Sequence, residues 1–422
     1  DKSAAERLNE SSAKYSARLE AQPNGWAMQY YPTYRDESPF GSGYLILMRF
    51  NPDFSVDVSM DNRFSNNAYA SATSGWEVIK DNGPVLTFNT YNQCMHAFSD
   101  PEDIPWTEDS EQSEGCGGDY EFIIVDAPED ASYMMLKGKK RNTYNLLTPI
   151  EEGVDYAEYL ADVKKFHNTT FPETELVSNL IHFGDSVYRM DGSNDGLPNI
   201  YPYNADAIAN ESFNPFLITK RGEDYYLRFR DAFEKDFMEG TLQELRYDSI
   251  QQVFIGTDNA DFRITGFDPS TFFYDNMLSS HVWQFIPATD VTGSMAEVLA
   301  IISADFAARK YTLENVKFSG IGNDATIILG LKQGTKSVNL TYLYDVTFED
   351  GKTTLSYREP YTTKSNKQSE QILSIIPSIL DFLNAANGTY TAEKAAPEPF
   401  NLGTLKVTHS SGSTITVQYG AK

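Results

Sequence analysis

The segment from Gly41 to Arg141 constrains the fold most, because strand signals and turn signals alternate along it. Residues 54–61 switch strictly between apolar and polar side chains, so every second side chain lies on one face of a half-buried strand. The apolar face holds Phe54, Val56, Val58 and Met60. Further on, Asp81-Asn82-Gly83 separates two strand-like runs and accepts the positive φ of a tight hairpin. These features predict an up-and-down antiparallel meander.

Strand signals return in the second half of the chain. They lie around 186–190, 215–219, 225–229, 242–247, 251–255 and 262–265. A spacing of roughly 8–12 residues with turns between is typical of a sandwich or barrel. The last third adds helices to a long alternating strand over 337–348. We therefore predict an α+β fold, predominantly antiparallel β meanders (barrel- or sandwich-like) with a C-terminal α+β module.

Two short motifs mark the starts of helices. Ser3-Ala4-Ala5-Glu6 and Ser294-Met295-Ala296-Glu297 both have the form of a capping box, in which serine and glutamate bond backbone N–H groups reciprocally. They predict helices over 3–21 and 294–310. Two more helices are expected over 155–166 and 369–386, and Pro377 should kink the second because proline lacks a backbone donor.

The length of 422 residues suits two or three domains. We divide the chain into an N-terminal helix with the first meander (1–170), a second β-rich region (171–290) and the C-terminal module (291–422). Whether the first two regions share one core is left open.

The charge balance limits the partners. Sixty acidic and 34 basic residues give a net charge of −26, which repels nucleic acid and anionic lipid but is compatible with cations and neutral sugars. A plainer interpretation is that the acidity maintains solubility. No apolar run approaches the roughly 20 residues that cross a bilayer, so a soluble mature domain is expected. Because Asp1 is not a methionine, we expect that a leader has been removed.

Catalytic motifs are missing from the sequence. The five histidines show no i,i+4 pair, and neither H-E-x-x-H, G-x-S-x-G nor a Walker loop occurs. Two acids for glycoside hydrolysis can lie on any two strands, and 60 acids give no basis for naming a pair. The two cysteines, Cys94 and Cys116, form either one disulfide or two thiols.

Two groups of residues are candidates for ligand binding. Asp191, Ser193 and Asp195, followed by Gly196, resemble the first half of a calcium loop, but Pro202 stands where the loop needs a bidentate glutamate. A polar turn is the favoured interpretation, and calcium is the one cofactor considered. The second group consists of loop aromatics that either bind sugar or peptide or form small local cores: Trp106, Tyr201 and Tyr203.

Several short motifs occur in an order that resembles a known family. They include Gly25-Trp26, Gly83-Pro84-Val85-Leu86-Thr87-Phe88, Gly118-Asp119-Tyr120-Glu121-Phe122, Leu136-Lys137-Gly138-Lys139-Lys140 and Phe318-Ser319-Gly320-Ile321-Gly322-Asn323. The chain is similar to domain-of-unknown-function family 4302, a family of Bacteroidetes surface lipoproteins. The resemblance implies a lipid anchor upstream of Asp1 as the only membrane attachment, a place at the outer membrane, and uptake components as partners. It assigns no catalytic residue.

The leading hypothesis is a non-enzymatic, envelope-anchored protein that binds glycan or peptide for uptake. It depends on the missing catalytic motifs, the acidity, the aromatic-rich strands and the family resemblance. One alternative is a glycosidase or peptidase whose residues are scattered over strands, and two facing carboxylates in a cleft would favour it. Another alternative is a structural subunit of a surface complex.

Overall fold

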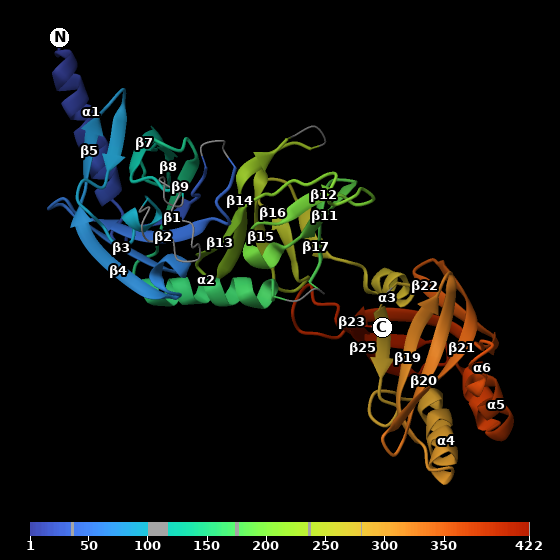
Figure 1. Ribbon diagram of the computed structural model, residues 1–422. Coiled ribbons are helices and arrows are strands. Elements are labelled where there is room, and N and C mark those ends of the chain that lie inside the picture. Colours follow the sequence, from blue (N-terminus) through green and yellow to red (C-terminus); the bar gives the residue numbers. More distant parts are fainter. Residues whose placement is uncertain (35–37, 100–116, 174–176, 235–237, 280, 422) are drawn as a thin grey trace. The chain divides into compact units, whose positions relative to one another are not determined.

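The computed structural model describes residues 1–34, 38–99, 117–173, 177–234, 238–279 and 281–421 (Figure 1). It divides into two compact units. Unit 1 comprises Asp1–Glu173 and Ser178–Thr265, and unit 2 comprises Thr174–Val177 and Gly266–Lys422. The first two regions expected from the sequence, up to residue 265, thus lie in one unit. The predicted α+β fold with predominantly antiparallel strands is confirmed.

Unit 1 begins with helix α1 and a nine-stranded antiparallel sheet. Its strand order is β4-β3-β2-β1-β9-β8-β7-β6-β5, so β4 and β5 are the edges. The helix is α1 (Ala4–Glu20) and the strands are β1 (Trp26–Tyr30), β2 (Tyr44–Phe50), β3 (Ser55–Asn62), β4 (Ala68–Gly75), β5 (Glu77–Lys80), β6 (Pro84–Thr87), β7 (Glu121–Asp126), β8 (Met134–Gly138) and β9 (Tyr144–Pro149). The short 3₁₀ helices are η1 (Arg63–Ser65) and η2 (His96–Ser99).

The alternation predicted over 54–61 holds for most of that strand. Val56, Val58 and Met60 are buried on the core face of β3. Phe54 is the exception, because β3 begins one residue later and Phe54 occupies a turn with φ of 63° and a 52% exposed side chain. The predicted capping box is confirmed, since Glu6 N–H donates to Ser3 Oγ and Ser3 N–H donates to the Glu6 carboxylate.

A second antiparallel sheet completes unit 1, in the order β12-β11-β10-β17-β16-β15-β14-β13. Helix α2 (Tyr156–Thr170) lies along both sheets and contacts β3 of the first and β13 of the second (Figure 1). The strands are β10 (Asn179–Phe183), β11 (Ser186–Asp191), β12 (Asn199–Pro202), β13 (Phe216–Arg221), β14 (Asp224–Phe233), β15 (Leu242–Asp248), β16 (Val253–Gly256) and β17 (Phe262–Gly266), with the 3₁₀ helix η3 (Ser193–Asp195) after β11.

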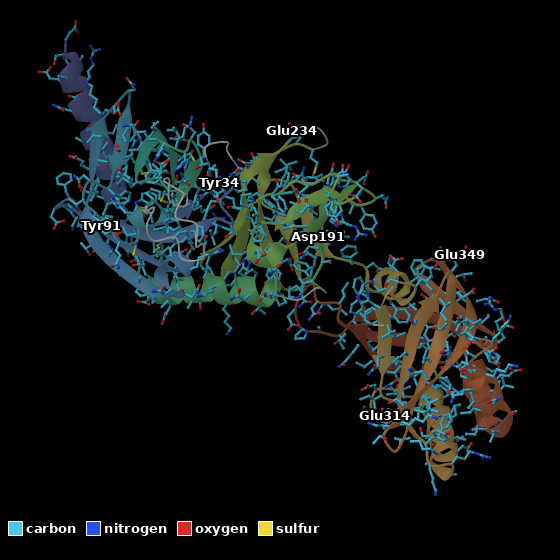
Figure 2. All side chains as sticks on the ribbon, viewed as in Figure 1. Tyr34, Tyr91, Asp191, Glu234, Glu314 and Glu349 are labelled. Atoms are coloured by element: carbon cyan, nitrogen blue, oxygen red, sulfur yellow. The ribbon has the colours of Figure 1, made fainter. Side chains whose placement is uncertain are left out.

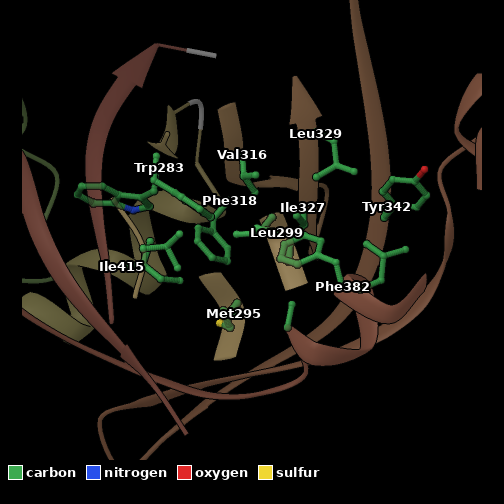
Figure 3. Close-up of a cluster of buried hydrophobic side chains, with 14 of the residues drawn as sticks. Trp283, Met295, Leu299, Val316, Phe318, Ile327, Leu329, Tyr342, Phe382 and Ile415 are labelled. Carbon is green, nitrogen blue, oxygen red and sulfur yellow. The ribbon is translucent and has the colours of Figure 1, made fainter. Parts of the chain in front are cut away.

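Unit 2 is a closed eight-stranded antiparallel barrel, in which β25 pairs back with β18. The strands are β18 (His281–Phe285), β19 (Thr312–Ile321), β20 (Asp324–Gln333), β21 (Lys336–Glu349), β22 (Lys352–Pro360), β23 (Gly388–Lys394), β24 (Thr404–His409) and β25 (Thr414–Ala421). The helices are α3 (Pro269–Met277), α4 (Ser294–Ala308), α5 (Gln368–Ile375) and α6 (Ser378–Ala385). Figure 3 shows the core, where Leu299 of α4 and Phe382 of α6 join strand residues such as Phe318.

Two local predictions for unit 2 have different outcomes. Pro377 does more than kink the predicted helix, since α5 ends at Ile375 and α6 begins at Ser378. The second capping box was wrong. Gly293 occupies the N-cap of α4 without a side-chain bond, and the N–H of Met295 instead donates to Ser413 Oγ at 3.1 Å. Gly293 has a φ of 77° and takes the N-cap position, so α4 begins at Ser294, one residue earlier than the predicted box requires. The side chain that caps the helix therefore comes from Ser413 in the β24–β25 hairpin.

Candidate functional site

An open hollow of about 640 Å³ lies at the β5 edge of the nine-stranded sheet. Its lining residues come from β5, β6, the 88–99 segment and the start of β7, and we call it the aromatic hollow. They are Glu77, Ile79, Thr87, Phe88, Asn89, Thr90, Tyr91, His96, Ser99, Tyr120 and Glu121. Figure 2 labels Tyr91, whose side chain lies at the surface of unit 1.

Three rings lie together in the aromatic hollow. The His96 imidazole stacks on Tyr120, with the two centroids 4.6 Å apart, and makes a tilted contact with Tyr91 at 5.3 Å. The interplanar angles are 25° and 36°. Tyr91 is 65% exposed and Tyr120 is 41% exposed, so much of both rings is open to a ligand. Exposed aromatic rings that lie together on a surface often mark a binding site.

Asn92 fixes the position and tautomer of His96. The Asn92 N–H donates to His96 Nδ1 at 3.0 Å, and its side-chain oxygen accepts from the N–H groups of Cys94 and Met95. Because Nδ1 is an acceptor, the proton of the neutral imidazole is on Nε2, which has no hydrogen-bond partner among the described residues. Burial lowers the pKa of His96 below 6.5, so the ring is a neutral donor at pH 7.

Asp119 fixes the backbone next to Tyr120. The Asp119 carboxylate accepts from the N–H groups of Lys140 and Arg141, at 3.1 and 2.8 Å for Oδ2, which ties the start of β7 to the β8–β9 turn. Its own N–H donates to the Tyr30 hydroxyl at 2.6 Å. Burial raises the pKa of Asp119 to about 6, against the opposing effect of these backbone donors.

Two carboxylates border the rings. Glu77 of β5 and Glu121 of β7 both pair with Thr87 of β6, so the three side chains form a row across neighbouring strands. The opposite face of these strands, with Leu86 and Phe122, belongs to the core. Lys139 Nζ lies 3.8 Å from the Glu121 carboxylate. Glu77 has no partner in the part of the chain that the structure describes.

The arrangement suits binding of a hydroxyl-rich molecule. Aromatic faces stack on the apolar faces of sugar rings, and donors and acceptors around them form hydrogen bonds with the sugar hydroxyls. The His96 Nε2–H, the tyrosine hydroxyls and the Glu77 carboxylate all border the aromatic hollow. Ser99 Oγ at the same hollow is buried and has no hydrogen-bond partner among the described residues.

The predicted calcium residues lie at the end of β11. Asp191 accepts a 2.5 Å hydrogen bond from the hydroxyl of Tyr201, Ser193 is buried within η3, and Asp195 is exposed. The glycines on both sides of η3 have positive φ and make the turn. Among the described residues, no three His, Cys, Asp or Glu side chains form a group that could hold a metal ion. The bond to Tyr201 involves one oxygen of the Asp191 carboxylate, and calcium binding at this turn stays a prediction.

Two of the three aromatics predicted to bind a ligand lie in the described residues. Tyr201 is 6% exposed in β12, so its ring belongs to the interior. Tyr203 is half-buried under the Arg189 guanidinium, 4.8 Å from its ring centroid. Trp106 and Cys116 lie outside the described residues. Cys94 is buried, and burial raises the pKa of its thiol to about 11.

A second hollow of about 610 Å³ lies in unit 1 between η1, α2 and β13. Lys164 of α2 and Asp61 of β3 form an ion pair in it, 2.9 Å apart. His167 also lines it, and its Nε2 lies 2.8 Å from the carbonyl of Asn194. Because Lys164 and Asp61 neutralise each other, they offer a ligand less than the unpaired Glu77 of the aromatic hollow does.

Sequence reasoning missed Tyr91, His96 and Tyr120. The only available signal was that Tyr91 stands between turn-forming residues Thr90 and Asn92, where an aromatic side chain has no strand to join. The 28 residues between the two tyrosines hide their proximity, because the pairing of β6 with β7 creates it.

Comparisons with known proteins give a family without an activity. The profile of a family described as "Domain of unknown function (DUF4302)" matches residues 1–248. No protein of curated function matches. In the described part of the chain, no helix combines the length and apolar character that a membrane span requires.

Similar solved structures include two sliding-clamp proteins. A candidate DNA polymerase III β subunit from Eubacterium rectale is 7% identical over 97% of both chains, with a TM-score of 0.13. The DNA polymerase sliding clamp from Caulobacter crescentus is 9% identical over 97% of this chain and 98% of that chain, also with a TM-score of 0.13. At these TM-scores the alignments carry no argument about fold or function.

Proposed function

Because the chain belongs to the family described as domain of unknown function DUF4302, whose description names no activity, we propose a function from the geometry of its site. The protein is a non-enzymatic binding protein that captures a glycan in the aromatic hollow. The observation that carries this proposal is the partly exposed ring cluster of Tyr91, His96 and Tyr120.

The physical argument rests on what the site offers. An exposed tyrosine ring presents a large rigid face at little entropic cost, and a stacked neighbour fixes its orientation before a ligand arrives. The hollow is open, which suits a segment within a long polymer as well as a chain end. Sugars are also compatible with the net charge of −26, unlike nucleic acid.

The location and partners belong to the same proposal. A lipid anchor upstream of Asp1 would hold the protein at the outer membrane, beside components that import the captured glycan. The motif order along the chain and the family membership of residues 1–248 support this. A peptide is the alternative ligand, because peptide side chains also stack on tyrosine.

A glycan and peptide array followed by calorimetry tests the proposal. Tyr91→Ala and Tyr120→Ala should each weaken binding of the array hit by about 1–2 kcal/mol, as expected for loss of a stacking ring. Tyr144→Ala is the matched control, since Tyr144 is 51% exposed in β9 and does not line the hollow. Equal losses for all three variants, or a folded protein that binds nothing on the array, would refute the proposal.

Glycoside hydrolysis is a second candidate because the hollow contains two carboxylates. Glu77 and Glu121 are two strands apart, which puts their Cα atoms about 10 Å from each other. Inverting glycosidases need carboxyl groups about 6.5–9.5 Å apart. If the bound glycan is cleaved, and Glu77→Gln and Glu121→Gln each abolish cleavage while binding persists, the protein is a hydrolase. An intact glycan after prolonged incubation supports the binding function.

A further inference from the structure

The described residues that line the aromatic hollow carry charge of one sign. The charged ones are Glu77 and Glu121, and none of these described lining residues is a lysine or arginine. Lys139 partly neutralises Glu121 from outside the lining and also contacts Asp81. Glu77 is therefore the unpaired carboxylate of the site.

We propose that the glycan captured here is an amino sugar oligomer with protonated amines, and that Glu77 binds an ammonium group while Tyr91 and Tyr120 stack on the sugar rings. This inference rests on the proposed function and names its ligand class. An ammonium group is attracted both to a carboxylate and to the face of a tyrosine ring.

The neighbouring groups fit the same ligand. His96 has its proton on Nε2 and is neutral, so it can donate to a sugar hydroxyl without repelling an ammonium group. Thr87 separates the two glutamates across the strands and is only 7% exposed, so the row is acidic at both ends and uncharged in the middle. The net charge of −26 raises the local concentration of a cationic oligomer at low salt.

Calorimetry with a matched pair of oligosaccharides tests the inference on the full chain. The probes are a glucosamine oligomer and an N-acetylglucosamine oligomer of equal length, at about pH 6.5, where a free amine is protonated. The glucosamine oligomer should bind about fivefold tighter at low salt, because it adds an ion pair and a cation–π contact. Raising the salt to about 0.5 M should remove most of this preference.

Two variants identify the carboxylate. Glu77→Gln should abolish the preference, so that both oligomers bind with about equal affinity, and it should leave binding of the acetylated oligomer unchanged. Glu129→Gln is the control, because Glu129 is an exposed residue of unit 1 that does not line the hollow. It should change neither value.

The outcomes separate this inference from the proposed function. Equal affinity for the two oligomers, or a preference that survives Glu77→Gln, overturns the inference while glycan binding stands. Failure of both oligomers, together with a negative array, overturns the proposed function itself.

Discussion

Removing the hydroxyl of Tyr344 should destabilise unit 2 by about 2 kcal/mol. Tyr344 is fully buried in β21, and its hydroxyl donates to the carbonyl of Leu383 at 2.6 Å. Leu383 lies in the last turn of α6, where carbonyls have no partner within the helix. Tyr344→Phe keeps the ring but loses this bond and leaves a buried carbonyl unpaired, which costs about 1–3 kcal/mol.

The magnitude can be checked by urea unfolding. Trp283 is the only tryptophan of unit 2, so its part of the fluorescence change reports that unit. The other three tryptophans report unit 1, and far-ultraviolet circular dichroism follows the whole chain. With an m-value of about 2 kcal/mol/M, a loss of about 2 kcal/mol lowers the midpoint of the unit 2 transition by about 1 M. The unit 1 transition should not move.

Two further variants complete the test. The hydroxyl of Tyr390 donates to the carbonyl of Ala386, the C-cap of α6, so Tyr390→Phe should cost a similar amount. Tyr361→Phe is the control, because Tyr361 is 38% exposed and its hydroxyl has no hydrogen bond in the described structure. A loss below about 0.5 kcal/mol for Tyr344→Phe, or an equal loss for Tyr361→Phe, would show that these hydroxyls do not hold α6.

Three other predictions concern the helix cap and the titrating groups. Ser413→Ala should lower the free energy of unfolding by about 1 kcal/mol in urea, because it removes the side chain that caps α4. An unchanged free energy of unfolding would show that the cap is dispensable. The lowered pKa of His96 means that the folded state binds fewer protons than the unfolded chain, so stability should fall as pH drops below 6.5, and His96→Asn should flatten this slope. For Asp119, whose pKa is raised from 3.8 to about 6, the folded state binds more protons, so this group's contribution to stability is lost as pH rises from 3.8 through about 6. Asp119→Asn should remove that loss, measured as the pH dependence of the unfolding midpoint.

Local signals predicted much of the fold. The interacting residues of the Ser3–Glu6 box and of the Asn82-Gly83 turn are at most three positions apart, so their geometry follows from the local sequence. Pro377 acts on its own turn and broke the helix where expected. The cap of α4 could not be predicted, since Ser413 is 118 residues from Met295. The closed barrel of unit 2 was not predicted, because the sandwich-or-barrel spacing was seen over residues 186–265 and the C-terminal part was expected only as an α+β module.

The candidate site was harder to predict because it depends on strand pairing. Alternation identified β6 and β7 as strands, but not that they are neighbours with Thr87 opposite Glu121. That register brings Tyr120 to His96. The sequence did indicate an aromatic binding surface without catalytic motifs, but it named other aromatics. Tyr201 is buried and Tyr203 is half-buried, and their role in binding stays a prediction.

The closure of the barrel in unit 2 determines when this unit can fold. His281 of β18 pairs with Ala421 of β25, so the first and last strands of the barrel are neighbours although almost the whole unit separates them in sequence. During synthesis, β18 has no partner on that side until β25 has left the ribosome. Contacts of such long range form slowly, and open strand edges meanwhile favour association with other chains. Unit 2 therefore completes its folding only after β25 has emerged, whereas the hairpins of unit 1 can pair as they emerge.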